Sequence, residues 1–248
     1  MANYNEIEKA LDNRAKKKNL NVSFSKMRYA NSLFYGAAGR RKLEKVLFVG
    51  IGHGHNAVLA LLDGLIGSAV GVDPYIASHG NDEKDMESLM ELIDTCLLSE
   101  RLILVKSTIE DYMNVTSEAF DAIICEDVLH HIFECSTVLR KSKMFLSAIN
   151  LFQNFWNKTN NDGLLLISEV NRYGLRPFLQ NVKILNGSIN YKTKQPWQEW
   201  TKAAVRANWR MYKLTNYVPY VFREKAKILS GPMGRYSICH RYHLSFLK

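Results

Sequence analysis

The chain has 248 residues, 47% of them hydrophobic and 23% charged, which is enough to bury a substantial core. We therefore expect one α/β domain with elaborated ends. The longest apolar stretch, residues 58–72, contains Asp63 and three glycines, which excludes a membrane-spanning helix. Residues 1–18 alternate charges and lack the apolar centre of a signal peptide, so we expect a cytoplasmic protein. The four cysteines show no Cys-x-x-Cys spacing, which favours free thiols over a zinc site.

The net charge of +9 is unevenly distributed along the chain. Residues 1–45 carry 11 Lys/Arg against 4 Asp/Glu, residues 46–171 carry 7 against 18, and residues 172–248 carry 15 against 2. The three balances are therefore +7, −11 and +13. Solvated basic surfaces could explain the flanks by themselves. Alternatively, the basic flanks bind an anionic partner next to an acidic core.

Residues 1–44 are expected to form an N-terminal cap or lid, and residues 45–248 the main domain. Within the cap, residues 3–19 have a narrow apolar stripe that predicts an exposed helix. Residues 24–35 are dense in aromatic and polar side chains.

The main domain begins with a strand, a glycine loop and a helix. Residues 46–49 are a continuous apolar run, typical of a strand that is buried on both faces. Gly50, Gly52 and Gly54 then allow a sharp turn and the close approach of a ligand. The following helix offers its amino end, so a nucleotide-like ligand is expected. His55 stands where a dinucleotide-binding fingerprint requires its last glycine, which argues against NAD and FAD.

The next strand, residues 69–73, ends in Asp73, whose carboxylate can accept hydrogen bonds from a ribose diol. The alternative is structural: the glycines close a turn and Asp73 caps the turn after it. Together, the Gly-x-Gly-x-Gly loop and Asp73 resemble the class I S-adenosylmethionine-dependent methyltransferases. The resemblance implies a Rossmann-like, mostly parallel seven-stranded sheet with an antiparallel last strand, and S-adenosyl-L-methionine as cofactor. It also implies that residues 24–35 cover the ligands, and the candidate acceptor contacts there are Arg28, Tyr29 and Tyr35.

A helix is predicted from apolar spacing between Met86 and Leu97, followed by a third strand over residues 102–105. Residues 107–111 follow that strand. In the resembled family an apolar residue here packs on adenine and an acid contacts the adenine amino group. We assign these roles to Ile109 and to Glu110 or Asp111.

A fourth buried strand over residues 120–124 leads into Cys125-Glu-Asp-Val-Leu-His130. This run resembles small-molecule O-methyltransferases, in which a histidine at the place of His130 deprotonates the acceptor hydroxyl. His130 could instead be an ordinary residue at a helix start. Glu126 and Asp127 are further candidates, for cofactor contacts or for binding an amine. Methylation of nucleic-acid bases loses support because no Asn/Asp-Pro-Pro-aromatic motif follows this strand.

The remaining pattern predicts a helix over residues 144–156, a turn over 160–163 and a fifth strand over 164–169. Residues 171–196 are interpreted as an insertion on the acceptor side. Residues 197–217 are expected to form an aromatic, basic helix on which Arg206 and Arg210 share a face. Two final strands are expected over residues 220–229 and 236–247, joined by a turn at 230–234.

The sequence thus predicts a methyltransferase that acts at an oxygen of a small anionic metabolite, phosphorylated or nucleotide-linked. Arg172 and Arg176 follow the fifth strand and are expected to hold the anion. A small-molecule N-methyltransferase and an RNA methyltransferase that uses the basic flanks are the alternatives. Aminopropyl transfer from decarboxylated cofactor and a non-catalytic binding role have less support.

Overall fold

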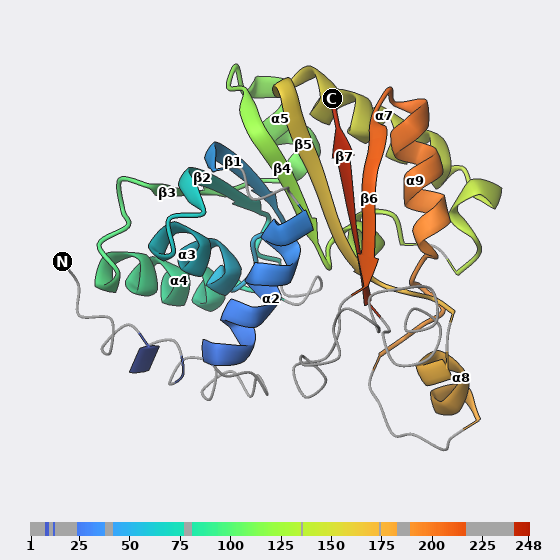
Figure 1. The fold of residues 1–248 in the computed structure, drawn as a ribbon, viewed down its shortest axis with the longest axis horizontal. Coiled ribbons are helices and arrows are strands. Elements are labelled where there is room, and N and C mark those ends of the chain that lie inside the picture. Colours follow the sequence, from blue (N-terminus) through green and yellow to red (C-terminus); the bar gives the residue numbers. More distant parts are fainter. Residues whose placement is uncertain are drawn as a thin grey trace. The chain divides into compact units, whose positions relative to one another are not determined.

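The structure is a computed structural model that describes residues 8–9, 12, 24–37, 42–76, 81–134, 136–173, 175–182, 189–216 and 241–248. The chain divides into two compact units, Met1–Thr116 and Ser117–Lys248, each with alternating strands and helices (Figure 1). None of the described helices is long and apolar enough to cross a membrane.

The first unit contains three parallel strands in the order β3-β2-β1. Its elements are α2 (Phe24–Ala37), β1 (Leu43–Val49), α3 (His55–Leu62), β2 (Ile66–Asp73), α4 (Glu83–Thr95), β3 (Leu102–Lys106) and α5 (Ile109–Val115). The last four residues of β1 are all buried, as the apolar run predicts. Because parallel strands end at the same edge, the glycine loop after β1 and Asp73 at the end of β2 share that edge.

The helices of this unit start and stop at recognisable signals. Helix α4 begins with a capping box, in which the Asp82 side chain accepts from Asp85 N and the Asp85 side chain accepts from Asp82 N. Helix α3 ends at Leu62 with Asp63 as its C-cap, and the next residue, Gly64, has a φ of +67° that turns the chain so that Leu65 N donates to Ala60 O at 2.9 Å.

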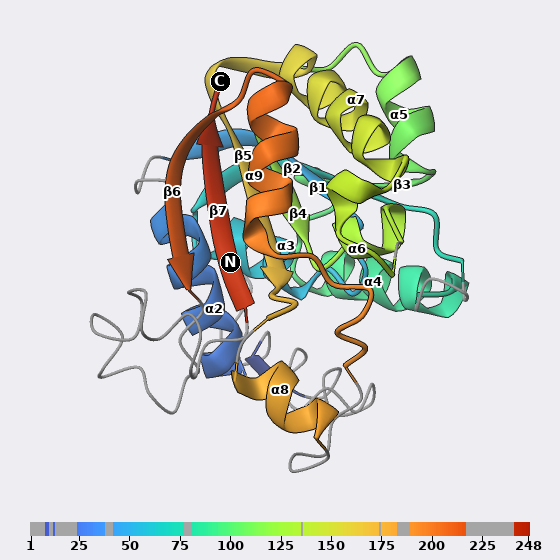
Figure 2. The same ribbon diagram turned by 90° about the vertical axis from the view of Figure 1, so that its right-hand side faces the viewer.

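The second unit contains four strands in the order β4-β5-β7-β6, with β7 antiparallel to both of its neighbours. Its elements are β4 (Phe120–Glu126), α6 (Leu129–Ile132), the 3₁₀ turn η2 (Leu139–Lys141), α7 (Met144–Asn157), β5 (Thr159–Val170), α8 (Leu175–Asn181), α9 (Trp197–Arg206), β6 (Arg210–Asn216) and β7 (Arg241–Leu247). Helices α7 and α9 lie side by side, and α9 packs against β6 and β7 (Figure 2). The indole of Trp209 is buried and donates to Phe152 O at 2.9 Å.

Two predicted elements are wrong. The predicted turn at residues 160–163 lies inside β5, although Asp162 has a left-handed φ of +61° that marks an irregularity. The predicted helix over 197–217 stops at Arg206, because Asn208 is left-handed (φ +72°) and Trp209 N donates back to Ala204 O at 3.0 Å. Arg210 therefore lies on strand β6, and Arg206 and Arg210 do not share a helix face.

Several predictions concern residues that are not described. Apart from residues 8–9 and 12, the N-terminal helix over 3–19 lies outside the described residues, as do the strand over 220–229, the turn over 230–234 and residues 236–240. Among the described residues, the final strand β7 pairs with β5 on one side and with β6 on the other.

Candidate active site

The loop between β1 and α3 has a backbone that favours glycine at three positions. Gly50, Gly52 and Gly54 have φ values of 65, 52 and 67°. A Cβ on Gly54 would stand 2.5 Å from Cδ1 of Leu89 on α4. The loop is tied to β2 by Gly50 N, which donates to Val72 O at 2.8 Å. The glycines are thus needed for the loop conformation, and Gly54 also for the packing of α4.

Asp73 is 4% exposed and is bonded to this loop. Its Oδ2 accepts from Gly52 N at 3.0 Å, and its Oδ1 accepts from Tyr75 N at 2.9 Å. The Asn81 amide adds a longer bond to Oδ2 at 3.4 Å. The bond from Tyr75 N shows that Asp73 also caps the turn that follows it, as the structural alternative for Asp73 predicts. A carboxylate offers about four acceptor sites, so Asp73 keeps capacity for one ligand hydroxyl, and two if Asn81 moves.

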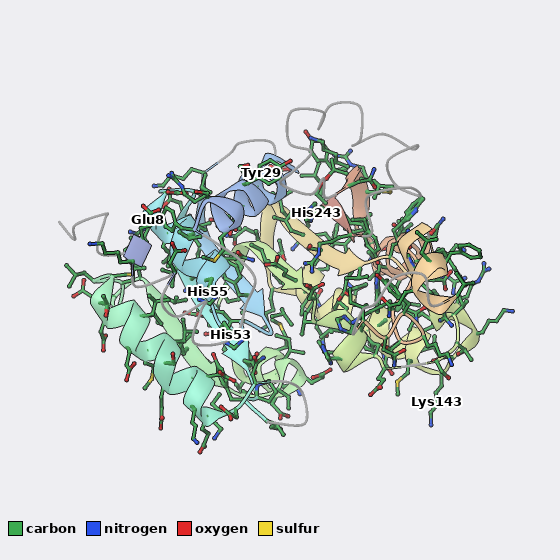
Figure 3. All side chains as sticks on the ribbon, turned by 90° about the horizontal axis from the view of Figure 1, so that it is seen from below. Glu8, Tyr29, His53, His55, Lys143 and His243 are labelled. Atoms are coloured by element: carbon green, nitrogen blue, oxygen red, sulfur yellow. The ribbon has the colours of Figure 1, made fainter. Side chains whose placement is uncertain are left out.

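Two histidines, which the sequence analysis left without a role, alternate with the glycines. His53 and His55 lie with ring centroids 6.0 Å apart (Figure 3). His53 Nδ1 lies 3.6 Å from Oδ1 of Asp85, the buried capping residue of α4. The His53 side chain is 26% exposed, whereas His55 is buried at the start of α3. Only His53 of the pair therefore presents appreciable surface to a ligand.

The start of α5 carries the predicted adenine contacts. Ile109 is buried and is the first residue of the helix, and Glu110 beside it is exposed. Thr108 caps the helix by accepting from Asp111 N, and its hydroxyl donates to the Asp111 carboxylate at 2.7 Å. Both acids are exposed, but Asp111 is engaged locally by Thr108.

In the second unit, His130 is held by a carboxylate that the sequence analysis missed. His130 Nδ1 lies 2.8 Å from Oε2 of Glu169, and the two residues are 5% and 1% exposed. The other oxygen, Oε1, accepts from Leu129 N at 2.8 Å. Glu169 ends the predicted fifth strand, so an acid at a strand end was the available signal. Its partner could not be read from the sequence, because the two residues are 39 positions apart.

Glu126 and Asp127, at the end of β4, both face Arg241, which is the first residue of β7. Glu126 Oε1 lies 3.8 Å from Arg241 Nη1, and Asp127 forms an ion pair with Arg241 Nη2. Asp127 has a left-handed φ of +52°, which is costly for a non-glycine residue. Its Oδ1 is buried without a hydrogen-bond partner in the structure.

Lys194 is a second cation near these acids, and it comes from the predicted insertion. The neighbouring Gln195 is fixed by three hydrogen bonds: its side chain bonds Leu139 N and Thr137 O, and its carbonyl accepts from the Tyr242 hydroxyl. Tyr242 is paired in register with Glu169. Burial lowers the pKa of Lys194, and the charges of Glu169 and Asp127 act in the opposite direction.

Comparison with solved structures decides the fold. No protein-family model matches the chain, and no curated protein matches it in sequence. The N-methyltransferase NodS from Bradyrhizobium japonicum superimposes with a TM-score of 0.56 and 9% identity, covering 91% of this chain and 97% of its own. The cyclopropane synthase MmaA2 from Mycobacterium tuberculosis gives 0.57 and 11%, covering 89% and 83%. The mycolic acid cyclopropane synthase CmaA1, complexed with SAH and CTAB, gives 0.56 and 14%, covering 89% and 83%.

The chain has the class I methyltransferase fold. The predicted mostly parallel seven-stranded sheet with an antiparallel last strand is therefore confirmed. In open α/β folds, ligands bind at the carboxyl ends of the strands. The glycine loop, Asp73 and Ile109 lie at such ends in the first unit, and Glu126, His130 and Glu169 in the second.

The predicted acceptor contacts on α2 lie at different distances from the glycine loop. Arg28 forms a two-bond contact with Asp63, which ends α3, at 3.1 and 2.9 Å. Asn31 Nδ2 donates to Asn56 O near the start of α3. Helix α2 thus runs antiparallel to α3, with Arg28 and the adjacent Tyr29 near the end of α3 farther from the glycine loop. Tyr35 lies toward the loop end and is buried.

The arginines predicted after β5 are only partly described. Arg172 Nη2 donates to Ser136 O at 2.8 Å, and its Nη1 is buried without a hydrogen-bond partner. Arg176 lies on α8, and its side chain is outside the described part of the structure. Cys125 is fully buried in β4, and burial raises the pKa of its thiol, so it is not an activated nucleophile.

Proposed function

We propose that this chain is an S-adenosylmethionine-dependent methyltransferase that acts at an oxygen of a small anionic acceptor, such as a phosphorylated or nucleotide-linked metabolite. The fold supports the reaction class, since the similar structures include an N-methyltransferase and a synthase complexed with SAH. The observation that carries the choice of oxygen is the buried pair of His130 and Glu169.

The residues at the carboxyl ends of the strands in the first unit suit the cofactor. The glycine loop offers a backbone without side chains at three positions, and Asp73 keeps room for a ribose hydroxyl. Ile109 and Glu110 are the proposed adenine contacts. When bound, S-adenosylmethionine supplies an electrophilic methyl group on its sulfonium.

His130 is the proposed general base. An ionised carboxylate only accepts hydrogen bonds, so the contact with Glu169 places the imidazole proton on Nδ1. The lone pair on Nε2 is then available to take the proton of an acceptor hydroxyl. Glu169 holds the ring in this orientation and stabilises the imidazolium that forms. The second hydrogen bond, from Leu129 N, fixes Glu169 in turn.

The anion is assigned to Arg172, with Arg176 and Lys194 as further candidates. The unpartnered Nη1 of Arg172 is a buried donor, and such a group is costly unless a ligand or water satisfies it. A phosphate or carboxylate oxygen suits a guanidinium donor. Arg172→Ala should raise the acceptor KM and leave cofactor affinity unchanged, which steady-state kinetics and cofactor titration would show together. Efficient turnover of a neutral acceptor by this variant would contradict the assignment.

N-methylation is the second candidate, because the buried Oδ1 of Asp127 lacks a hydrogen-bond partner and could accept from an amine. The test is a screen of hydroxyl and amine metabolites, with and without phosphate, and of RNA, for formation of S-adenosylhomocysteine by mass spectrometry. Turnover of phosphorylated alcohols or phenols supports the proposal. Turnover confined to amines would replace it with N-methylation, and turnover confined to RNA would assign the basic flanks to nucleic acid.

A further inference from the structure

Helix α8 lies apart from α7 and α9, beyond the end of β5 that carries Glu169 (Figures 1 and 2). Large apolar side chains face solvent here. Phe178 is 59% exposed, and Val182, just past the end of the helix, is 47% exposed. Val182 N donates to Phe178 O at 3.0 Å, so the two side chains are one helical turn apart and share a face. Tyr173, two residues before the helix, is also half-exposed.

The segment that contains α8 has only positive charges. Residues 172–196 carry five Lys/Arg and no Asp/Glu. The Gln180 amide on α8 donates to Ile189 O at 2.8 Å, which joins the helix to the turn that carries the exposed Lys192. In that turn Lys192 N donates to the Asn190 side chain at 3.1 Å. The structure thus holds an exposed apolar helix face and an exposed cation in one linked region.

This combination suits the interface of an anionic membrane. There, aromatic and aliphatic side chains enter the boundary between head groups and acyl chains, and anionic lipid attracts each lysine or arginine near the surface. RNA is the competing anion, since bases can stack on Tyr173 or Phe178. The apolar face favours lipid, because the aliphatic Val182 offers RNA neither a ring for stacking nor a hydrogen bond.

We propose that the α8 face formed by Phe178 and Val182 binds to a membrane that contains anionic phospholipid, with Lys192 at the head groups. The helix follows the end of β5, where Glu169 holds His130. The inference does not depend on the proposed reaction, so binding to lipid can fail while the methyltransferase assignment stands.

Co-sedimentation of the full chain with lipid vesicles tests this inference. We expect binding to vesicles of phosphatidylcholine mixed with phosphatidylglycerol and little binding to phosphatidylcholine alone. Binding should weaken as salt is added, because salt screens the head-group charge. Phe178→Ser should weaken binding about tenfold or more, since burial of a phenylalanine side chain is lost. Lys192→Ala should weaken it about fivefold, as expected for one cation near an anionic surface.

Val115→Ser is the matched control for Val182→Ser. Val115 is 81% exposed, but it ends α5 in the acidic part of the chain. Only Val182→Ser should weaken binding to the vesicles. Urea denaturation should change little for either variant, because both side chains are exposed, and it would show that the variants are folded.

Absence of wild-type binding to the anionic vesicles would overturn the inference. Equal binding by wild type, Phe178→Ser and Val182→Ser would overturn it as well, since the lipid would then be held elsewhere on the chain. If the wild type binds RNA in place of vesicles, and Phe178→Ser weakens that binding, the α8 face belongs to a nucleic-acid surface.

Discussion

His130 and Glu169 carry the chemistry at the scale of single residues. Loss of a positioned base costs roughly 10²–10⁴ in rate, so His130→Ala should lower kcat by that factor at unchanged cofactor affinity. Glu169→Gln should lower kcat as well, because a neutral amide stabilises the imidazolium less well and can hold the wrong tautomer. The measurement is turnover of an acceptor found in the metabolite screen, together with cofactor titration.

The neighbouring His131 provides the control for this pair. Its ring lies 4.1 Å from that of His130, but the residue is exposed. His131→Ala should therefore keep nearly full activity. If His130→Ala also kept full activity, the base role would be wrong, and an amine acceptor beside Asp127 would become the better account.

Gly54 tests the packing of the glycine loop against α4. Gly54→Ala places a Cβ 2.5 Å from Leu89 at a φ of +67°, which should cost about 1–3 kcal/mol of unfolding free energy. Gly36→Ala is the matched control, because Gly36 lies in α2 with no atom within 4 Å of the added Cβ. That change should stabilise the protein by up to about 1 kcal/mol. Urea denaturation that shows equal effects for both variants would contradict this account of the loop.

At the scale of elements, the buried histidine of β7 makes stability depend on pH. Burial, reinforced by Arg241, lowers the pKa of His243 from 6.5 to about 3. Between these values the unfolded chain binds a proton that the native chain does not. Stability is therefore unaffected above pH 6.5 and falls as the pH decreases, by about 2 kcal/mol at pH 5.

His243→Gln removes the contribution of His243 to the pH dependence of stability, since glutamine does not titrate. Its unfolding free energy should fall less than that of wild type between pH 7.5 and pH 5, by about 2 kcal/mol, whatever its stability at pH 7.5. Urea denaturation at the two pH values measures the difference, because the other titrating groups are common to both proteins. Equal losses in the two proteins would mean that His243 is protonated in the native state.

The elements also show how far the sequence could predict the structure. Strands β1, β2 and β4 were predictable because continuous apolar runs end in glycine or acid. The end of α9 was missed, although Asn208 is a residue type that tolerates the left-handed turn found there. The contact of Glu169 with His130 was not predictable, because it depends on how α6 and β5 meet in space. The ion pair of Arg241 with Asp127 is equally long-range. Asp127 could therefore be predicted as a candidate site residue, but its partner could not.

For the whole molecule, the division into segments of charge +7, −11 and +13 is compatible with two kinds of partner, a nucleic acid or a small anion. A nucleic-acid surface would bind RNA with an affinity that falls steeply with salt, whereas a compact anion site would not. We predict weak RNA binding in gel shift at about 0.15 M salt, with no effect of Arg172→Ala. Tight binding that this variant weakens would favour the RNA methyltransferase.

The most direct test of the central claim is a calorimetric titration of the purified chain with S-adenosylhomocysteine and, separately, with NAD. The account predicts that S-adenosylhomocysteine binds and NAD does not, and that Gly52→Val abolishes the binding because its side chain fills the space beside the loop and opposes the φ of +52°. Absence of binding by S-adenosylhomocysteine, or tight binding of NAD, would contradict it.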